Sequence, residues 1–297
     1  MSWRPVTASS MTAVTTLLAV AVLTAQPAPP PKRIISIVPA VTEMLFAIGA
    51  GDQVAAVSSF DQSLEAEALP RVGALLDPDM ERIFSLRPDL VVLYGSQTEQ
   101  EGQLTRASIP VFSYRHGGLQ DVLDMIRLLG QRTGHAEEAD AVAISIEQEL
   151  AALATAIGTN RRPRTMLVFG REPDAIRNVY ASGGVGFLHD MLEAAGGTNI
   201  FSDVQREAAH PSSEAILAAA PEVIIELRAD AVTENTAISN AEAWQQFSAL
   251  PAVRTQRVHM LTGNELVVPG PRVAEVIRRL AELLHPAAIT KKVEGRK

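Results

Sequence analysis

The sequence contains no cysteine at all. Disulfides are therefore excluded, and the hydrophobic cores alone must hold the fold together, even if the protein is exported to an oxidising compartment. A lipid attached to an N-terminal cysteine is excluded for the same reason. The chain has 297 residues, which is enough for two lobes with a core in each.

The sequence also lacks the motifs of several enzyme classes. It has no G-x-x-x-x-G-K-[ST] phosphate loop, no H-E-x-x-H zinc motif and no G-x-S-x-G nucleophile motif. The six histidines are scattered, with no pair at metal-ligand spacing, so no metal site is predicted. Asp61 could act in acid–base chemistry, but nothing pairs with it. We expect a non-enzymatic protein with no cofactor of its own; a periplasmic enzyme on a two-lobed scaffold is the alternative.

Basic charge is scarce relative to acidic charge. The formal net charge is -8 at pH 7, whereas a nucleic-acid-binding protein carries a basic face. Nucleic acid is therefore not expected as a partner, and a small-molecule ligand remains open.

The N-terminal segment has the pattern of a signal peptide, predicted here to span residues 1–25. Arg4 supplies a weak positive start, and Met11 to Ala25 form an apolar run too short to cross a membrane. An uncleaved membrane anchor is the alternative. Residues 26–32 then form a flexible lead-in, so the sequence predicts export to the periplasm.

From residue 33 the sequence alternates between strand and helix patterns. Short β-branched runs are followed by amphipathic stretches, which predicts parallel sheets with helices on both faces. The pattern divides into an N-terminal lobe over 33–117 and a C-terminal lobe over 159–286, followed by a tail over 287–297. The predicted fold class is α/β, with two doubly wound lobes.

A long helical pattern separates the two lobes. Residues 118–158 contain no proline, and apolar residues recur at intervals of three and four. We expect a rigid backbone helix that braces the lobes, bent or interrupted at Gly130 and Gly134. Such a connection disfavours large hinge motion.

One helix–proline–strand unit occurs twice. "MERIFSLRPDLVVLY" begins at Met80 and "SEAILAAAPEVIIEL" at Ser213, and the two align without a gap. Glu81 and Glu214 occupy the same place in each, in the first turn of a helix, where an anion favours the helix dipole. Asp77 is expected to cap the first of these helices. Surface solvation explains each glutamate alone, but the repetition indicates two similar anchors for a two-fold symmetric partner.

Ligands of open α/β sheets bind beyond the carboxyl ends of the strands. In the first lobe this rule selects Pro39, Phe60, Tyr94, Arg115 and His116. In the second lobe it selects Arg171, Arg228 and Asn264, and nearby loops add Tyr180 and His210. Aromatic residues make up only 4% of the chain, so their presence at such positions favours a flat or bulky ligand.

Three long stretches resemble a known family. They are "RIISIVPAVTEMLFAIGAGDQVAAVSSF", "VGALLDPDMERIFSLRPDLVVLY" and "YASGGVGFLHDMLEAAGGTNIF" with the following "SSEAILAAAPEVII". They are similar to the periplasmic substrate-binding proteins with a helical backbone, which serve ABC importers for vitamin B12, ferric siderophores and haem. The resemblance implies a monomer that carries a metal chelate, and cobalamin is the first choice. It also implies that Glu81 and Glu214 dock onto a two-fold permease dimer in the inner membrane.

The resemblance further implies that aromatic side chains hold the corrin ring, with Phe60, Tyr94 and Tyr180 at such positions. The chain departs from the B12-binding pattern at Leu75 and Ala208, where tryptophans are expected, and at Asn264, where an aspartate is expected. The alternative is haem or a ferric siderophore. Arg115, His116, Arg171 and Arg228 would then contact an anionic ligand, and Tyr94, Tyr114, His116 or His210 would be the candidate axial haem ligand.

Overall fold

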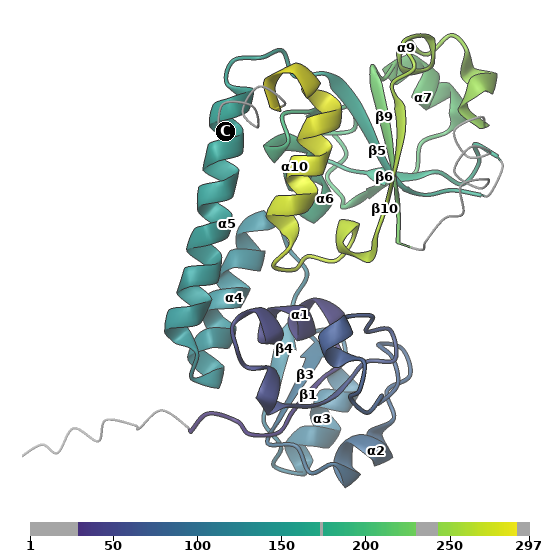
Figure 1. Ribbon diagram of the computed structural model, residues 1–297. Helices are drawn as coiled ribbons and strands as arrows, with labels where there is room; N and C mark the ends of the chain where they lie inside the picture. The colour runs from purple at the N-terminus through teal and green to yellow at the C-terminus, as the bar shows by residue number, and fades with distance from the viewer. Residues whose placement is uncertain (1–28, 173–174, 230–242, 290–297) are drawn as a thin grey trace, which may run out of the picture.

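The computed structural model describes residues 29–172, 175–229 and 243–289, which form two α/β lobes joined by a pair of helices (Figure 1). The predicted signal peptide and residues 290–297 of the predicted tail lie outside the described residues. Within the described part of the chain, no helix is long and apolar enough to cross a membrane. The predicted α/β class is confirmed.

The N-terminal lobe contains a four-stranded parallel sheet in the order β2-β1-β3-β4. Its strands are β1 (Ile34–Ser36), β2 (Val54–Val57), β3 (Leu90–Tyr94) and β4 (Val111–Tyr114). Helix α1 (Pro39–Ala47) packs on one face of the sheet, and α2 (Met80–Ser85) and α3 (Thr98–Arg106) pack on the other. This lobe is doubly wound, as the strand–helix alternation predicts.

The C-terminal lobe contains a mixed sheet in the order β10-β9-β5-β6-β8. β5 (Arg164–Gly170), β9 (Val223–Arg228) and β10 (Val258–Thr262) are parallel, and β7 (Thr198–Asn199) pairs with β5. β6 (Tyr180–Ser182) is antiparallel to its two neighbours, β5 and β8 (Ala208–Ala209). The helices are α6 (Phe187–Ala194), α7 (Ser213–Ala219), α9 (Pro251–Arg254) and α10 (Val273–Leu284). The order β10-β9-β5 repeats β4-β3-β1, so the lobes share a plan and differ at one edge.

Each sheet separates a central core from an outer core. On β3, Leu90 and Val92 face the central core, whereas Val91 and Leu93 face the outer core of the N-terminal lobe. This alternation follows from the two-residue period of a strand. The central core is continuous through both lobes, because it also contains buried residues of α6, β9 and α10. The C-terminal lobe has its own outer core beneath α7 and α9.

The expected backbone helix is in fact a helical hairpin. α4 (Leu119–Thr133) ends at Gly134, which has φ 83, and α5 (Ala136–Ile157) then runs back along it (Figure 1). Gly130 lies inside α4 and does not interrupt it; its missing Cβ leaves room for Ala139 of α5. Arg127 of α4 forms ion pairs with Asp140 and Glu147 of α5. α4 also contacts both lobes, because Leu119 at its start donates to Asp190 of α6 and Thr133 at its end accepts from Gln53.

Candidate functional site

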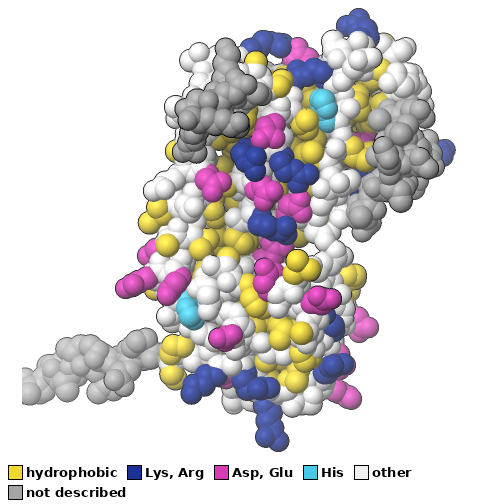
Figure 2. Space-filling view, viewed as in Figure 1, with side chains coloured by type: hydrophobic (Ala, Val, Ile, Leu, Met, Phe, Trp, Pro, Cys, Tyr) yellow, Lys and Arg dark blue, Asp and Glu magenta, His cyan; other side chains and the backbone are white. Residues whose placement is uncertain are grey.

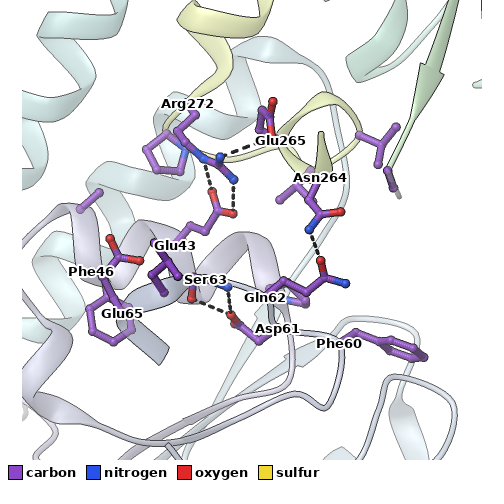
Figure 3. Close-up of a pocket in the computed structure, with 17 residues that line it drawn as sticks. Glu43, Phe46, Phe60, Asp61, Gln62, Ser63, Glu65, Asn264, Glu265 and Arg272 are labelled. Carbon is purple, nitrogen blue, oxygen red and sulfur yellow. Dashed lines mark hydrogen bonds and ion pairs between the residues drawn. The ribbon is translucent and has the colours of Figure 1, made fainter. Parts of the chain in front are cut away.

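A cavity of about 710 Å³ lies between the two lobes (Figure 3). The N-terminal lobe contributes one side of α1, from Pro39 to Ala47, and residues 60–65 after β2. The C-terminal lobe contributes Ala229 and the segment from Asn264 to Arg272. Pro39, Phe60 and Asn264, all selected from the sequence by their place after strands, line this cavity together. Asn264 donates a hydrogen bond to Gln62, so the two lobes touch directly across it.

Among the described residues, one phenylalanine and one tyrosine are exposed, one on each lobe. Phe60 lines the cavity with 69% of its surface exposed, and Tyr180 of β6 is 43% exposed. The Tyr180 ring packs edge-on against His210 at a centroid distance of 4.3 Å. Large rings are usually buried, and exposed ones with free faces can stack against a ligand.

A row of aromatic rings runs from the N-terminal lobe to α6 of the C-terminal lobe. Tyr94 of β3 contacts Tyr114 at 5.5 Å, Tyr114 contacts His116 at 6.4 Å, and His116 contacts Phe187 of α6 at 6.4 Å. Tyr94 is half-buried and burial raises its pKa, whereas His116 is exposed. Tyr114 is buried, and burial raises its pKa far above the ordinary value. Because a tyrosine binds haem iron as its phenolate, this environment disfavours Tyr114 as an axial ligand.

The structure places Arg171 in the interior of the C-terminal lobe, which corrects its predicted role as a ligand contact. Its fully buried guanidinium pairs with Glu226 of β9, with Nε 2.6 Å from Oε1. Trp244 also donates to this carboxylate over 2.6 Å, and Arg228 lies 3.4 Å from it. Burying a guanidinium is costly unless it is paired, so Arg171 serves the fold.

The remaining cationic candidates lie at the surface. Arg115 and His116 follow β4 and are exposed, whereas Arg228 is partly exposed beside Glu226. Leu75 and Ala208, the positions of the missing tryptophans, are both partly exposed. In the described ranges, no group of three or more His, Cys, Asp and Glu side chains is placed to hold a metal ion.

Sequence reasoning missed a charged network across the cavity. Glu43 of α1 accepts two hydrogen bonds from Arg272, at 2.7 Å from Nη2 and 3.2 Å from Nε. Glu265 lies 3.5 Å from Arg272 and 2.6 Å from Arg279. The hydrogen bond that Arg272 donates to Glu43 is the main reason that the pKa of Arg272 is raised. Acidic and basic side chains gather along α10 and down to the junction of the lobes (Figure 2).

Glu81 and Glu214 occupy matching places on the outer layers of the lobes. Each is exposed and stands two residues after its N-cap, which is Asp79 for α2 and Ser212 for α7. Asp79 replaces the expected cap Asp77. A hydrogen bond with Ser212 lowers the pKa of Glu214, so its charge is retained to lower pH. Both helices lie on the side of the molecule away from α5 (Figure 1).

The chain matches a known protein family over most of its length. The periplasmic binding protein family matches residues 34–264. A vitamin B12-binding protein of Vibrio parahaemolyticus is 27% identical over 257 residues, which cover 85% of this chain and 89% of that protein.

Solved structures of periplasmic binding proteins have the same fold. A periplasmic vitamin B12-binding protein of Vibrio cholerae has a TM-score of 0.73 at 26% identity, covering 87% of this chain and 98% of that chain. A periplasmic haem-binding protein from Roseiflexus sp. RS-1 in its apo form has a TM-score of 0.71 at 25% identity, covering 86% of this chain and 99% of that chain.

Proposed function

The chain belongs to the periplasmic binding protein family, and we propose on that premise that it captures cobalamin between its lobes and delivers it to an ABC importer. The observation that carries the proposal is the exposed ring of Phe60 at the wall of an open cavity between the lobes. Tyr180 adds a second exposed ring on the opposite lobe. A flat macrocycle offers both faces to such rings. The similarity to vitamin B12-binding proteins over most of the chain supports the same ligand.

The cavity suits a bulky ligand in size as well as in shape. Its volume of about 710 Å³ falls in the range of small-molecule and cofactor sites, and both lobes contribute to its walls. Apolar side chains such as Phe46, Val267 and Val268 supply contact area, and Asn264 and Gln62 supply polar groups. No covalent chemistry is needed from any of them, because capture and release are binding steps.

Delivery is proposed to depend on Glu81 and Glu214. Two acidic side chains at matching places on related lobes complement a two-fold symmetric permease with one basic site in each subunit. An exposed ion pair contributes at most about 1 kcal/mol, so two such pairs orient the protein without trapping it on the membrane. We propose that the working protein is a monomer in the periplasm.

A second candidate ligand is haem or a ferric siderophore, which keeps the fold and the docking residues. The observation that favours it is the exposed pair Arg115 and His116 at the end of β4, next to the ring row. An arginine can bind a carboxylate through two parallel hydrogen bonds, and a histidine can coordinate iron. The haem-binding structural relative supports this alternative.

Calorimetric titration of the exported protein with cyanocobalamin, haemin and a ferric siderophore tests the proposal. We expect one-to-one binding of cyanocobalamin, and a loss of about tenfold or more in affinity for Phe60→Ala and for Tyr180→Ala, since stacked rings contribute beyond their area. Leu128→Ala, on an exposed part of α4, is the control and should leave affinity unchanged. Binding of haemin or the siderophore without binding of cyanocobalamin would overturn the cobalamin proposal in favour of the second candidate ligand.

A further inference from the structure

The walls of the cavity carry more acidic than basic groups. Among the described residues that line it, Glu43, Asp61, Glu65 and Glu265 are acidic and Arg272 is the one basic residue. The charge of Arg272 is already met by two carboxylates, one from each lobe (Figure 3). The cavity therefore offers hydrogen-bond acceptors and no unpaired cation among its described lining residues.

The guanidinium of Arg272 is engaged on all three nitrogens. Nε and Nη2 donate to the two oxygens of Glu43, and Nη1 lies 3.5 Å from Glu265. Glu265 is in turn held by Arg279, which also donates to the carbonyl oxygen of Thr262. The Arg272 side chain is 45% exposed, so a ligand carboxylate could approach it, but its charge is already shared between Glu43 and Glu265. A carboxylate added there would lie beside these two anions, and like charges brought together repel one another.

Asp61 provides an acceptor that its own surroundings do not satisfy. Its Oδ1 accepts hydrogen bonds from the backbone and the hydroxyl of Ser63, at 3.0 and 2.6 Å. Its Oδ2 is buried and has no hydrogen-bond partner among the described residues, and the whole residue is 5% exposed. A buried acceptor without a donor carries a cost that a donor can remove. The loop that follows β2 is thus prepared for a hydrogen-bond donor.

We propose that Glu43, Glu265 and Asp61 select the ligand by charge, and that the cavity takes a macrocycle bearing neutral donors such as primary amides rather than carboxylates. This inference rests on the proposed function of the cavity as the ligand site. Glu43 and Glu265 exclude anions by occupying Arg272, and Asp61 favours donors. Cobalamin carries amides on its ring substituents, whereas haem carries propionates, so charge separates the two candidates.

The test compares ligands that differ only in this charge. Cyanocobalamin is titrated beside its monocarboxylic derivatives, in which one side-chain amide has been hydrolysed to a carboxylate. We expect the best-bound monocarboxylate to bind about tenfold or more weakly than the amide form, because like charges placed together in a site cost several kcal/mol. Equal or tighter binding of a carboxylate would overturn the proposal.

Three variants locate the effect. Glu43→Gln and Glu265→Gln should each reduce the ratio of the affinity for cyanocobalamin to that for its monocarboxylate, because each removes a carboxylate that pairs with Arg272. Asp61→Asn should weaken the binding of cyanocobalamin. Glu282→Gln is the matched control, because Glu282 lies on α10 and pairs with Arg278 outside the cavity. Circular dichroism and thermal melting establish that each variant is folded. A preference unchanged in both Glu43→Gln and Glu265→Gln would overturn the role of the network.

Haemin is also titrated beside its diamide, in which both propionates have been converted to amides. This comparison tests the charge preference without assuming that cobalamin is the ligand. If no corrinoid binds but haemin and its diamide do, the cobalamin proposal fails. The relative affinity of haemin and the diamide then still measures the charge preference. Tighter binding of the diamide would then support the preference, and tighter binding of haemin itself would overturn it. If neither pair binds, both proposals fail.

Discussion

His259 is a residue whose protonation bears on stability. It lies on β10, and its Nε2 is buried without a hydrogen-bond partner among the described residues. Burial, with the nearby charge of Arg257, lowers the pKa of His259 below its ordinary value of 6.5. Above that value both folded and unfolded chains hold a neutral ring. Below it the unfolded chain gains a proton that the folded chain resists, so stability falls as the pH decreases.

We predict a smaller free energy of unfolding at about pH 5.5 than at about pH 7.5, and a shallower pH dependence for His259→Gln. Urea unfolding of both proteins at the two pH values measures this. Carboxylates with lowered pKa, such as Glu222, contribute chiefly below their ordinary value of 4.5 and do not account for a change in this range. The same pH dependence in the variant would contradict the assignment to His259.

Single residues were predictable from the sequence where local position decides their place. The end of a strand and the start of a helix identified Pro39, Phe60 and Asn264, which line one cavity. The same rule failed for Arg171, because its partner Glu226 lies 55 residues further on, in a strand that begins with three apolar residues. Glu43 and Arg272 are separated by 229 residues, so no local pattern joins them.

At the scale of secondary-structure elements, the contact between α4 and α5 depends on a glycine. A Cβ built at Gly130 would lie 2.3 Å from Cβ of Ala139 and 2.8 Å from the backbone oxygen of His135. We predict that Gly130→Ala destabilises the protein by about 1–3 kcal/mol through overpacking. Chemical denaturation gives the value.

Gly102 provides the matched substitution. It lies within α3, where the nearest atom to an added Cβ is the flexible guanidinium of Arg106 at 3.5 Å. Gly102→Ala should stabilise the protein by about 0.5–1 kcal/mol, because alanine has the higher helix propensity. If both substitutions changed stability in the same direction, close packing of the hairpin would not be the cause.

Elements were predicted better than their junctions. Strand and helix periodicity gave the alternation, and Gly134 was expected to bend or interrupt the long helix, which does end there. The apolar repeat over 118–158 does not reveal that the chain also reverses its direction at Gly134. The reversal depends on a left-handed backbone at one glycine, and many glycines satisfy that condition. Similarly, "DPDM" holds two aspartates that could cap α2, and the structure uses the second, Asp79.

At the scale of the whole molecule, the docking proposal for Glu81 and Glu214 predicts which substitutions stop uptake. We expect the double substitution Glu81→Arg with Glu214→Arg to abolish uptake in cells that depend on this protein, because the docking proposal assigns both charges to contacts with the permease and the double substitution reverses them. Ligand affinity measured by calorimetry should stay unchanged, since neither residue lines the cavity. Each single substitution should reduce uptake only in part.

Glu149→Arg makes the same change of charge on an exposed position of α5, remote from both helices, and should leave uptake intact. A parallel loss of ligand affinity in the double variant would remove the docking role. So would full uptake in that variant.

The central core joins the two sheets, whose outer faces carry α2 and α7. Because a protein interior is closely packed, we expect the distance between these two helices to change little when a ligand binds. Empty and loaded molecules then present the same two glutamates at the same spacing. On the docking proposal, empty molecules compete with loaded ones for the permease. The rate of import depends on the fraction of molecules that carry cargo, so making more of the protein than the supply of ligand can fill would slow delivery.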